Sequence, residues 1–462
     1  MLELLCAPSH LVQGGWASRV TRLSCALLER YIGMSNSSFA ARRSDPADVA
    51  VVGAGVVGAA CAHALARAGF SVVLIDRQAP GHGASFGNAG HLATEQVFPV
   101  ADFSILKRLP RMLLDPMGPL RLDWRYLPRA VPWLTRLLLN LREGPFRRTV
   151  AGLRALNQQS LAAWERLLTQ IGAPALLHRD GSLLVFERPD SLPAVHALQQ
   201  RMVQQEVALA RWDAEAVQAA LPQLSPSIRG GLFFPDTGHF IDPYRVVCKL
   251  VEAARQRGVE LITGAVEEAR LCEDGVALRT AGGELRARKA LIACGAHSAR
   301  LTAMLTGKRV PLDTERGYHL MLPRELGRLP FAVTSFERRF IMTPMQGGLR
   351  LAGTVEFAGL ERAPAMARAW QLHALSRGLF IDDLDASEAV PWMGFRPSLP
   401  DSLPVIDQAC EGRVLLAFGH HHLGMTQAAV TAEAVTRMAL GASAHGGGAP
   451  ALPMTLYALS RF

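Results

Sequence analysis

The first strongly patterned segment of the chain is an apolar run, Val49–Val52, that leads into a glycine-rich turn. An alanine-rich segment follows at 59–68, and a second apolar run, Ser71–Ile75, ends in Asp76. Short apolar runs predict buried strands, and the alanine-rich segment predicts a helix between them. The pattern therefore predicts a strand–helix–strand unit that begins near residue 49.

The glycines of this turn have the spacing of a dinucleotide-binding unit. Gly53 permits a tight turn, Gly55 lets the backbone approach a pyrophosphate, and Gly58 lets the helix pack closely on the strand. Val56 and Val57 then stand at the helix N-terminus, whose dipole favours phosphate. Asp76, about 20 residues on, is placed to accept hydrogen bonds from ribose hydroxyls.

A membrane span is the alternative for this segment. Val49–Ala66 carries no formal charge over a length at the lower limit for a spanning helix. Three glycines close together fit a bend better than a span, and Asp76 closes the next strand. The nucleotide interpretation is therefore preferred.

The remaining pattern alternates strands and helices. Helices are expected at 150–172, 191–218 and 242–257, the last capped by Asp242 and Pro243, and from Met425 onward. Strands are expected at 181–186, 230–234, 258–262, 266–271, 276–279, 290–293, at several places within 315–353, and at 414–418. The proline-rich stretch 392–407 is expected to be irregular, and Gly446 is expected to open a loose C-terminal tail.

The composition indicates a packed fold, and the cysteines indicate a reducing environment. The 462 residues are 49% hydrophobic and 19% charged, enough for two or three domains. The seven cysteines are dispersed without a close pair, which indicates free thiols and a cytoplasmic location. Residues 1–46 precede the fold. They are interpreted as a disordered extension, either a targeting peptide or, preferably, the product of a mis-assigned start with Met34 as the true first residue.

Residues 101–148 are basic, with ten Lys or Arg against four Asp or Glu. Short helical pieces are expected here, broken by Pro110, Pro116, Pro119, Pro128 and Pro132. Trp124, Tyr126 and Trp133 among the arginines are compatible with a peripheral position at the anionic inner membrane. Helices packed on the rest of the protein are an equal alternative. Nucleic-acid binding is not favoured, because no basic sheet with interleaved aromatics appears.

Landmarks spread over residues 47–462 resemble the D-amino acid oxidase superfamily of FAD-dependent oxidoreductases, and most closely its bacterial D-amino acid dehydrogenases. These landmarks are the glycine turn, the loop Ser85–Gly90, the segment Leu291–Ser298, Gly394–Pro397 with Pro400-Asp401, and the turn Gly419–Thr426. The resemblance implies an α/β fold with a Rossmann-type FAD-binding domain and a second α+β substrate domain on an antiparallel or mixed sheet. It implies FAD-binding parts at 47–100, 231–310 and 391–462, a substrate or cap domain with helices at 101–230, and the substrate-domain sheet at 311–390.

The same resemblance implies which residues meet FAD. Besides the glycine turn and Asp76, these are Arg77, Ser85, Asn88, Ala89, Gly90, Val266, Cys294, Gly295, Gly419, His421, Leu423, Gly424, Met425 and Thr426. Val266 would hold adenine through its backbone, and the helix after Gly419 would direct N–H groups at the flavin pyrimidine oxygen. A metal site at the consecutive histidines is not expected, because neighbouring side chains point apart and no acidic or thiol partner lies nearby.

The implied reaction is hydride transfer from an amino or imino acid to flavin, leaving an imine that water hydrolyses. A guanidinium is needed to bind the substrate carboxylate, and Arg396 is the first candidate. Tyr318, His319 and His422 are further candidate catalytic residues, while Arg316 and Tyr244 are weaker ones. The electron acceptor is left open among a quinone, a partner protein and O₂.

Three alternative functions share parts of this pattern. An FAD enzyme for N-methyl amino acids or 2-hydroxy acids has the same cofactor loops. A flavoprotein subunit of a hetero-oligomeric dehydrogenase is a non-catalytic alternative. An NAD dehydrogenase fits the glycine turn alone, and the later flavin-type loops disfavour it.

Overall fold

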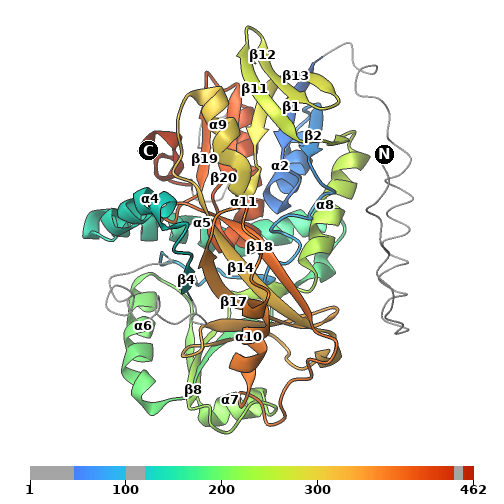
Figure 1. Ribbon diagram of the computed structural model, residues 1–462. Helices are drawn as coiled ribbons and strands as arrows, with labels where there is room; N and C mark the ends of the chain where they lie inside the picture. Colours follow the sequence, from blue (N-terminus) through green and yellow to red (C-terminus); the bar gives the residue numbers. More distant parts are fainter. Residues whose placement is uncertain (1–45, 100–119, 442–450) are drawn as a thin grey trace, which may run out of the picture. The chain divides into compact units, whose positions relative to one another are not determined.

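The structure is a computed structural model that describes residues 46–99, 120–441 and 451–462. Outside these residues lie nearly all of the expected N-terminal extension, residues 101–119 of the basic region, and the glycines at 446–448. The described chain forms two large sheets and one small one (Figure 1). Helices lie against both large sheets.

The first sheet is mainly parallel and contains the predicted strand–helix–strand unit. Its eight strands are β10 (Glu260–Thr263), β2 (Val72–Asp76), β1 (Ala47–Val52), β13 (Gly283–Ile292), β12 (Gly275–Thr280) and β11 (Val266–Cys272), with β20 (Val414–Phe418) beside β13 and β19 (Val405–Ala409) beside β20. β1 pairs in parallel with both β2 and β13, so their carboxyl ends share one edge. In such sheets ligands bind outside the carboxyl ends of the strands.

Alternation along β1 explains why both faces of this sheet are covered. Val49 and Val51 join a core with helices α2 (Val56–Arg67), α8 (Pro243–Gln256), α5 (Glu143–Gln170) and α11 (Gly424–Ala439). Ala50 and Val52 join the opposite core with α9 (Ser298–Thr306). Both faces of a parallel sheet are normally buried, which gives its strands near-continuous apolar runs.

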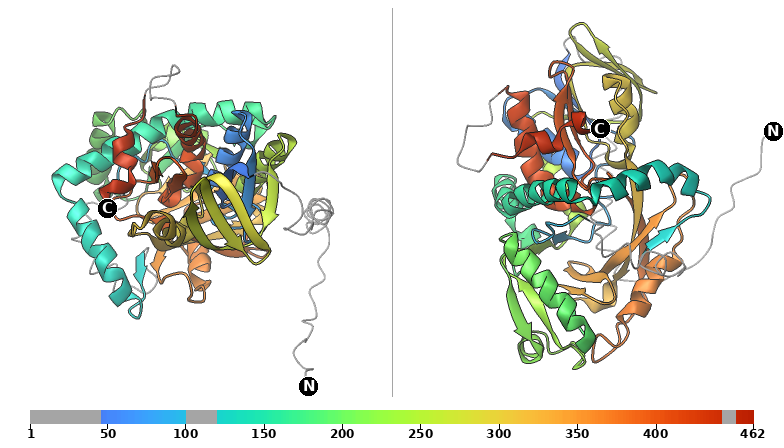
Figure 2. Two further views of the ribbon diagram at one scale, coloured as in Figure 1. Left: turned by 90° about the horizontal axis from the view of Figure 1, so that it is seen from above. Right: turned by 90° about the vertical axis from the view of Figure 1, so that its left-hand side faces the viewer.

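The second sheet is mixed and holds nine strands. Their order is β18 (Val390–Ser398), β14 (Asp313–Leu322), β17 (Gly348–Phe357), β16 (Phe340–Met345), β15 (Ala332–Ser335), β6 (Ser182–Phe186), β8 (Gly230–Phe234) and β7 (Ala210–Asp213), with β4 (Leu120–Leu122) beside β17. Helices α6 (Leu192–Gln204), α7 (Ala214–Ala220), α10 (Ala367–Ser376) and α4 (Leu127–Asn140) accompany it (Figure 2). A three-stranded sheet contains β3 (His91–Leu92), β9 (Gly238–Phe240) and β5 (Leu177–His178).

The predicted fold class is confirmed, and several local expectations are wrong. The stretch 392–407 is not irregular, since β18 runs to Ser398 and β19 begins at Val405. Pro391 and Pro397 are tolerated because β18 is the end strand of its sheet, where one side needs no amide donors. The sheet order also places β18 and β8 with the second sheet, whereas residues 391 and 231 were expected to open FAD-binding segments.

Two helix expectations also change. The segment 191–218 is broken into α6, β7 and α7, because Asp213 caps a new helix by accepting from the Ala216 amide. Pro132 lies inside α4 and does not end it, and Pro128 stands in its first turn, where prolines are tolerated.

The expected C-terminal tail is ordered beyond residue 450. Tyr457 is fully buried, and its hydroxyl donates to the Gly152 carbonyl of α5. Arg461 pairs with Asp401. Residues 451–462 therefore belong to the packed fold.

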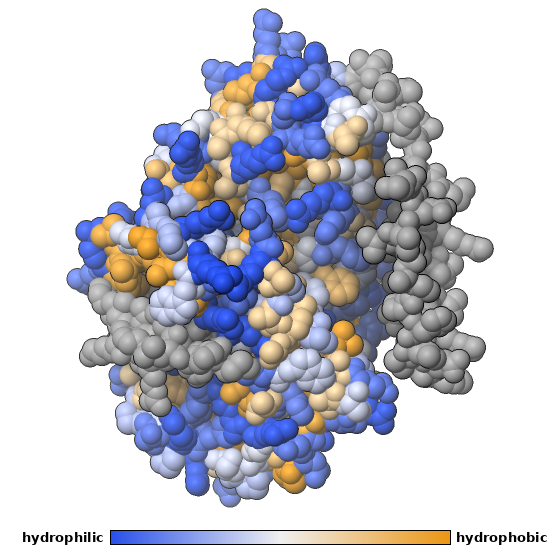
Figure 3. Space-filling model, in the orientation of Figure 1, coloured by the Kyte–Doolittle hydropathy of each residue, from blue (hydrophilic) through white to orange (hydrophobic). Residues whose placement is uncertain are grey.

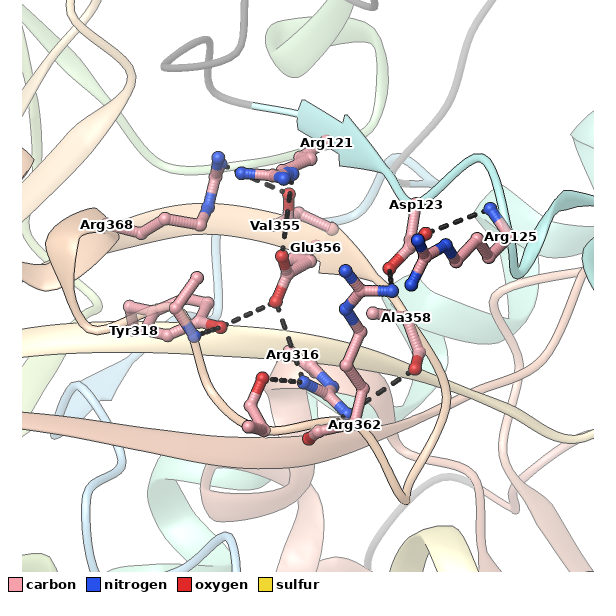
Figure 4. A network of polar contacts seen from close by, with 12 residues as sticks. Arg121, Asp123, Arg125, Arg316, Tyr318, Val355, Glu356, Ala358, Arg362 and Arg368 are labelled. Atoms are coloured by element: carbon pink, nitrogen blue, oxygen red, sulfur yellow. Dashed lines mark hydrogen bonds and ion pairs between the residues drawn. The ribbon is translucent and has the colours of Figure 1, made fainter.

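A buried polar network fixes the loop after β17 (Figure 4). Arg316 of β14 is fully buried and donates to the carbonyls of Ala358, Gly359, Arg362 and Ala363. Its guanidinium also lies 3.8 Å from Glu356, which accepts a hydrogen bond from the Tyr318 hydroxyl at 2.6 Å. Removing the guanidinium would leave the Ala358 and Gly359 carbonyls buried without this donor, and would take a neighbouring positive charge away from Glu356.

Replacing Arg316 with Met should lower the free energy of unfolding by about 3–5 kcal/mol, the usual cost of breaking a buried charged pair. Arg324→Met is the control, because Arg324 is exposed and its pairs with Asp385 and Glu388 lie at the surface, where such pairs contribute about 0–1 kcal/mol. Urea denaturation of both variants measures the difference. Equal losses would contradict the structural role of Arg316.

Candidate functional site

The turn after β1 combines close backbone packing with one open side. Gly53 has φ +108°, and a Cβ there would lie 2.4 Å from the Ala293 carbonyl oxygen. A Cβ at Gly58 would lie 1.8 Å from the Gly53 oxygen, so helix and turn are in direct contact. A Cβ at Gly55 would meet only Ser85 Oγ, at 3.4 Å. The turn is therefore packed tightly against backbone at Gly53 and Gly58 and is open at Gly55.

The N-terminus of α2 has no side-chain cap from its own N-cap residue and no acid in its first turn. The first amides of a helix lack intrahelical acceptors, so they attract anions. Val56 satisfies its amide by donating to Ser85 Oγ at 3.0 Å, which ties the loop 81–90 to the helix start. Val57 and Gly58 follow in the same turn. This arrangement fits a pyrophosphate, which is the group that an FAD cofactor would place here.

Asp76 stands at the carboxyl end of β2, beside this turn. Its Oδ2 accepts from the Ala54 amide at 2.7 Å and its Oδ1 from the Gln78 amide at 2.9 Å. Carboxylate oxygens have two acceptor sites each, so both can still accept from ribose hydroxyls. Arg77 instead contacts His297 Nε2 at 2.8 Å.

Three further residues expected to bind FAD follow the carboxyl ends of β13 and β10. Cys294 donates from Sγ to the Val52 carbonyl at 3.1 Å, and burial raises its thiol pKa to about 12. A protonated, buried thiol packs and does not react. Gly295 follows with φ +54°. Val266 begins β11, where the pairing with β12 shifts register, so its backbone is locally irregular.

The loop 81–90 is held between the two large sheets. His319 of β14 donates from Nδ1 to the Gly87 carbonyl at 2.8 Å, and Arg350 of β17 donates to the Asn88 carbonyl at 2.5 Å. Asn88 Oδ1 accepts from the Gly90 amide at 2.8 Å, which bends the chain around Ala89. Side chains of the second sheet therefore position a loop that belongs to the FAD-binding half.

Trp392 of β18 packs against this loop. Its indole stacks on the His319 ring at 5.0 Å, and a Cβ at Gly87 would lie 2.2 Å from the indole. A Cβ at Gly394 would lie 2.1 Å from the same ring. Glycine is required at both positions because the indole occupies the space of their side chains.

The turn from β20 to α11 begins at Gly419, which has φ +83° and rests on Leu399. The 3₁₀ turn His421–Leu423 leads into Gly424, and α11 starts there without a side-chain cap. Met425 and Thr426 are buried. Thr426 Oγ1 accepts from the Ala93 amide at 3.1 Å, and Trp164 donates to both the Met425 and Thr426 carbonyls.

The three histidines of this turn point to different partners. His420 contacts Thr431 Oγ1 at 3.1 Å, His421 contacts Ser398 Oγ at 2.9 Å, and His422 contacts Gln96 Oε1 at 2.5 Å. Burial, followed by the positive charge of Arg396, lowers the pKa of His422 to about 3. His422 is therefore neutral and near Arg396.

Arg396 lies on β18 directly across from Glu315 of β14. A Cβ at Gly317 would lie 2.4 Å from its Cζ, so the guanidinium rests over that glycine. Burial lowers its pKa, and the nearby charge of Glu315 opposes the change. No residue in the described ranges forms a hydrogen bond or an ion pair with its guanidinium. This cation is half-buried and available for an anionic ligand.

Alternation along β14 separates the candidate residues into two sets. Glu315, Gly317 and His319 share the face with Arg396 and Trp392. Tyr318 lies on the opposite face, in the core with α10. Its hydroxyl is bound by Glu356 and the Ala365 amide. Tyr318 and Arg316, two of the candidate residues, therefore belong to the buried network of Figure 4 and not to the face that bears Arg396.

Tyr244 lies outside this cluster. Its ring contacts Phe86 and His82 at centroid distances of 5.1 and 5.2 Å. Residues that the sequence pattern did not single out include Glu315, Trp392, Ser398 and Arg350. A signal for Glu315 existed, since Glu315, Gly317 and His319 alternate along a strand.

Comparisons with known proteins agree with this geometry. The family model described as FAD dependent oxidoreductase matches residues 48–438. The chain is similar to a protein named D-amino-acid oxidase from Bradyrhizobium diazoefficiens, with 34% identity covering 90% of this chain and 98% of that protein. It is also similar to a D-amino acid dehydrogenase of Vibrio cholerae, with 29% identity covering 82% and 92%. Glycine oxidase from Geobacillus kaustophilus shares the fold, with a TM-score of 0.70, 20% identity, and coverage of 91% and 100%.

Gly87→Ala should weaken FAD binding, because the new Cβ would displace Trp392 or the loop, and overpacking costs about 1–3 kcal/mol. The measurement is the flavin absorbance retained per protein after gel filtration. Gly83→Ala in the same loop is the control, because a Cβ there meets nothing within 4 Å. Equal flavin retention by the two variants would contradict the assignment of this loop.

Proposed function

Since the chain belongs to the family of FAD-dependent oxidoreductases, we propose that it oxidises D-amino acids or proline-like D-imino acids. The product is the imine, which water hydrolyses to a 2-oxo acid. FAD supplies the chemistry by accepting a hydride from the substrate Cα. The names of the similar proteins support this substrate class, and the half-buried guanidinium of Arg396 is the observation that carries it.

Arg396 binds the substrate carboxylate. A guanidinium offers two parallel donors to a carboxylate, and partial burial strengthens the interaction. Gly317 leaves room for the guanidinium, and the loop 85–90 and the turn 419–424 approach the same face of the second sheet. The carboxylate would thereby be fixed relative to the flavin loops, which is the positioning that hydride transfer requires.

The histidines beside Arg396 act as neutral groups. Burial lowers the pKa of His319 to about 3, and its Nδ1 is committed to the Gly87 carbonyl, which leaves Nε2 as an acceptor. His422 is likewise neutral. We propose that they orient the substrate amine and that no side chain removes a proton from Cα.

Arg396→Met should lower kcat/KM for the substrate by about 30-fold or more, since truncating one partner of a buried charge pair costs about 2–5 kcal/mol. Arg396→Lys should show a smaller loss of kcat/KM, because lysine keeps the positive charge but lacks the paired donors. Flavin content should stay at the wild-type level in both. Arg300→Met, on the exposed surface of α9, is the control.

The deciding test of the substrate class is anaerobic bleaching of the bound flavin. D-amino acids should reduce it, and their L-enantiomers, sarcosine and 2-hydroxy acids should not. Reduction by sarcosine or 2-hydroxy acids alone would replace the proposal with the corresponding alternative. No reduction by any of them, in protein that holds FAD, would contradict an independent catalytic role.

We further propose weak contact between α4 and an anionic membrane, where a quinone or partner protein would accept electrons. Val131, Leu138 and Leu139 are about half exposed along one stripe of α4, and Trp124 is 62% exposed just before it. Arg129 and Arg136 flank the stripe and are exposed. Figure 3 shows apolar side chains together where α4 lies in Figure 1. Such a helix fits an interfacial position. No helix in the described ranges is long and apolar enough to cross a bilayer.

Leu138→Glu should reduce co-sedimentation with vesicles rich in phosphatidylglycerol, because a carboxylate replaces an apolar contact and is repelled by the lipid. Leu326→Glu is the matched control, since Leu326 is 67% exposed at another position. High salt should weaken wild-type binding. Identical sedimentation of both variants and the wild type would contradict the contact.

A further inference from the structure

Glu315 is a buried carboxylate on the site face of β14. It is 2% exposed and lies directly across from Arg396, yet no ion pair joins the two side chains within 4 Å. Burial alone would raise its pKa, but the contacts with His421 and Ser398 and the charge of Arg396 outweigh this and lower it to about 2. Glu315 is therefore ionised at neutral pH.

A chain of hydrogen bonds connects Glu315 to the turn before α11. Ser398 donates its only hydroxyl hydrogen to Glu315 Oε1 at 2.5 Å, so its oxygen must accept from His421 Nδ1 at 2.9 Å. The Leu399 amide donates to His421 Nε2 at 2.9 Å. His421 thereby links the Ser398 side chain to the backbone of Leu399.

These bonds hold an unfavourable backbone conformation. His421 has φ +51°, and non-glycine residues in this region cost about 1–3 kcal/mol unless the surroundings impose it. Both ring nitrogens of His421 are bound at the end of β18, two or three residues after Arg396. The second sheet thus fixes the turn that leads into the uncapped α11 N-terminus.

We propose that Glu315 is a positioning residue and a permanent counter-charge of the site. Through Ser398 it holds His421 and the turn 419–424 against the end of β18. Its negative charge also opposes the other two negative charges of the reaction, the substrate carboxylate at Arg396 and the reduced flavin. It therefore weakens carboxylate binding and lowers the reduction potential of FAD. This inference rests on the proposed function for the placement of Arg396 and the flavin.

The test compares purified Glu315→Gln holoenzyme with the wild type. Glutamine keeps an oxygen for Ser398 and removes only the charge. We expect the two-electron midpoint potential to rise by about tenfold in the redox equilibrium constant, which is about 30 mV. The dissociation constant of acetate, followed by the flavin spectrum, should fall severalfold, while that of the neutral isostere acetamide should not change.

Two further variants separate charge from structure. Ser398→Ala removes the hydroxyl that links Glu315 to His421. Glu315→Asp has a shorter side chain, which draws the carboxylate away from Ser398. Both variants retain the negative charge. Both should retain less flavin after gel filtration than the wild type, because the turn 419–424 is no longer held, while the potential of the flavin that stays bound should change by much less than in Glu315→Gln. A shift of about 30 mV in either variant, or an unchanged potential with weaker acetate binding in Glu315→Gln, would overturn the proposal.

Failure of the proposed substrate class and failure of the counter-charge role of Glu315 give different results. If no D-amino acid bleaches the flavin, the proposed substrate class is wrong, and the potential and the acetate affinity still report on Glu315. If D-amino acids bleach it and Glu315→Gln changes neither quantity, only the counter-charge role is wrong.

Discussion

The side-chain alternation of β14 is the constraint on which the site depends. Odd positions, Glu315, Gly317 and His319, face the flavin-binding loops, while Arg316 and Tyr318 face the core beneath α10. A shift of one residue in register would exchange the two sets and place a buried structural arginine in the site. The neighbouring strand β17 absorbs an irregularity at Thr354, whereas the pairing of β14 with β18 is continuous. The strand that carries Arg396 is therefore held in exact phase with Glu315.

The two arginines of this region show how context decides the role of one residue type. Arg316 is fully buried and its donors are spent on backbone carbonyls and Glu356. Arg396 is half-buried beside one uncompensated carboxylate and two neutral histidines. Desolvation penalises both cations, but only Arg316 is compensated by hydrogen bonds and an ion pair within the protein. Arg396 would recover this cost on binding an anion, which is the role proposed for it.

Local patterns in the sequence were enough to identify the fold class, and they predicted the turns that we propose bind FAD. The glycine turn, Asp76 and the β20–α11 turn are defined by short-range spacing, so the chain reveals them directly. The face occupied by Tyr318 could not be fixed, because it depends on the register between strands about 75 residues apart. Ser398 and Glu315 were missed for the same reason: their hydrogen bond joins two strands that are distant in sequence. The prolines near residue 392 suggested irregularity, and only the sheet order shows that they lie at an edge.

Placing the strand that bears Arg396 at a sheet margin carries a hazard that the prolines of β18 reduce. An unpaired edge offers amides to any strand that approaches, including one from a second copy of the protein. Pro391 and Pro397 have no amide hydrogen to offer, and they bracket the part of β18 that bears Trp392 and Arg396. Extension of the sheet across this margin by another strand is thereby discouraged.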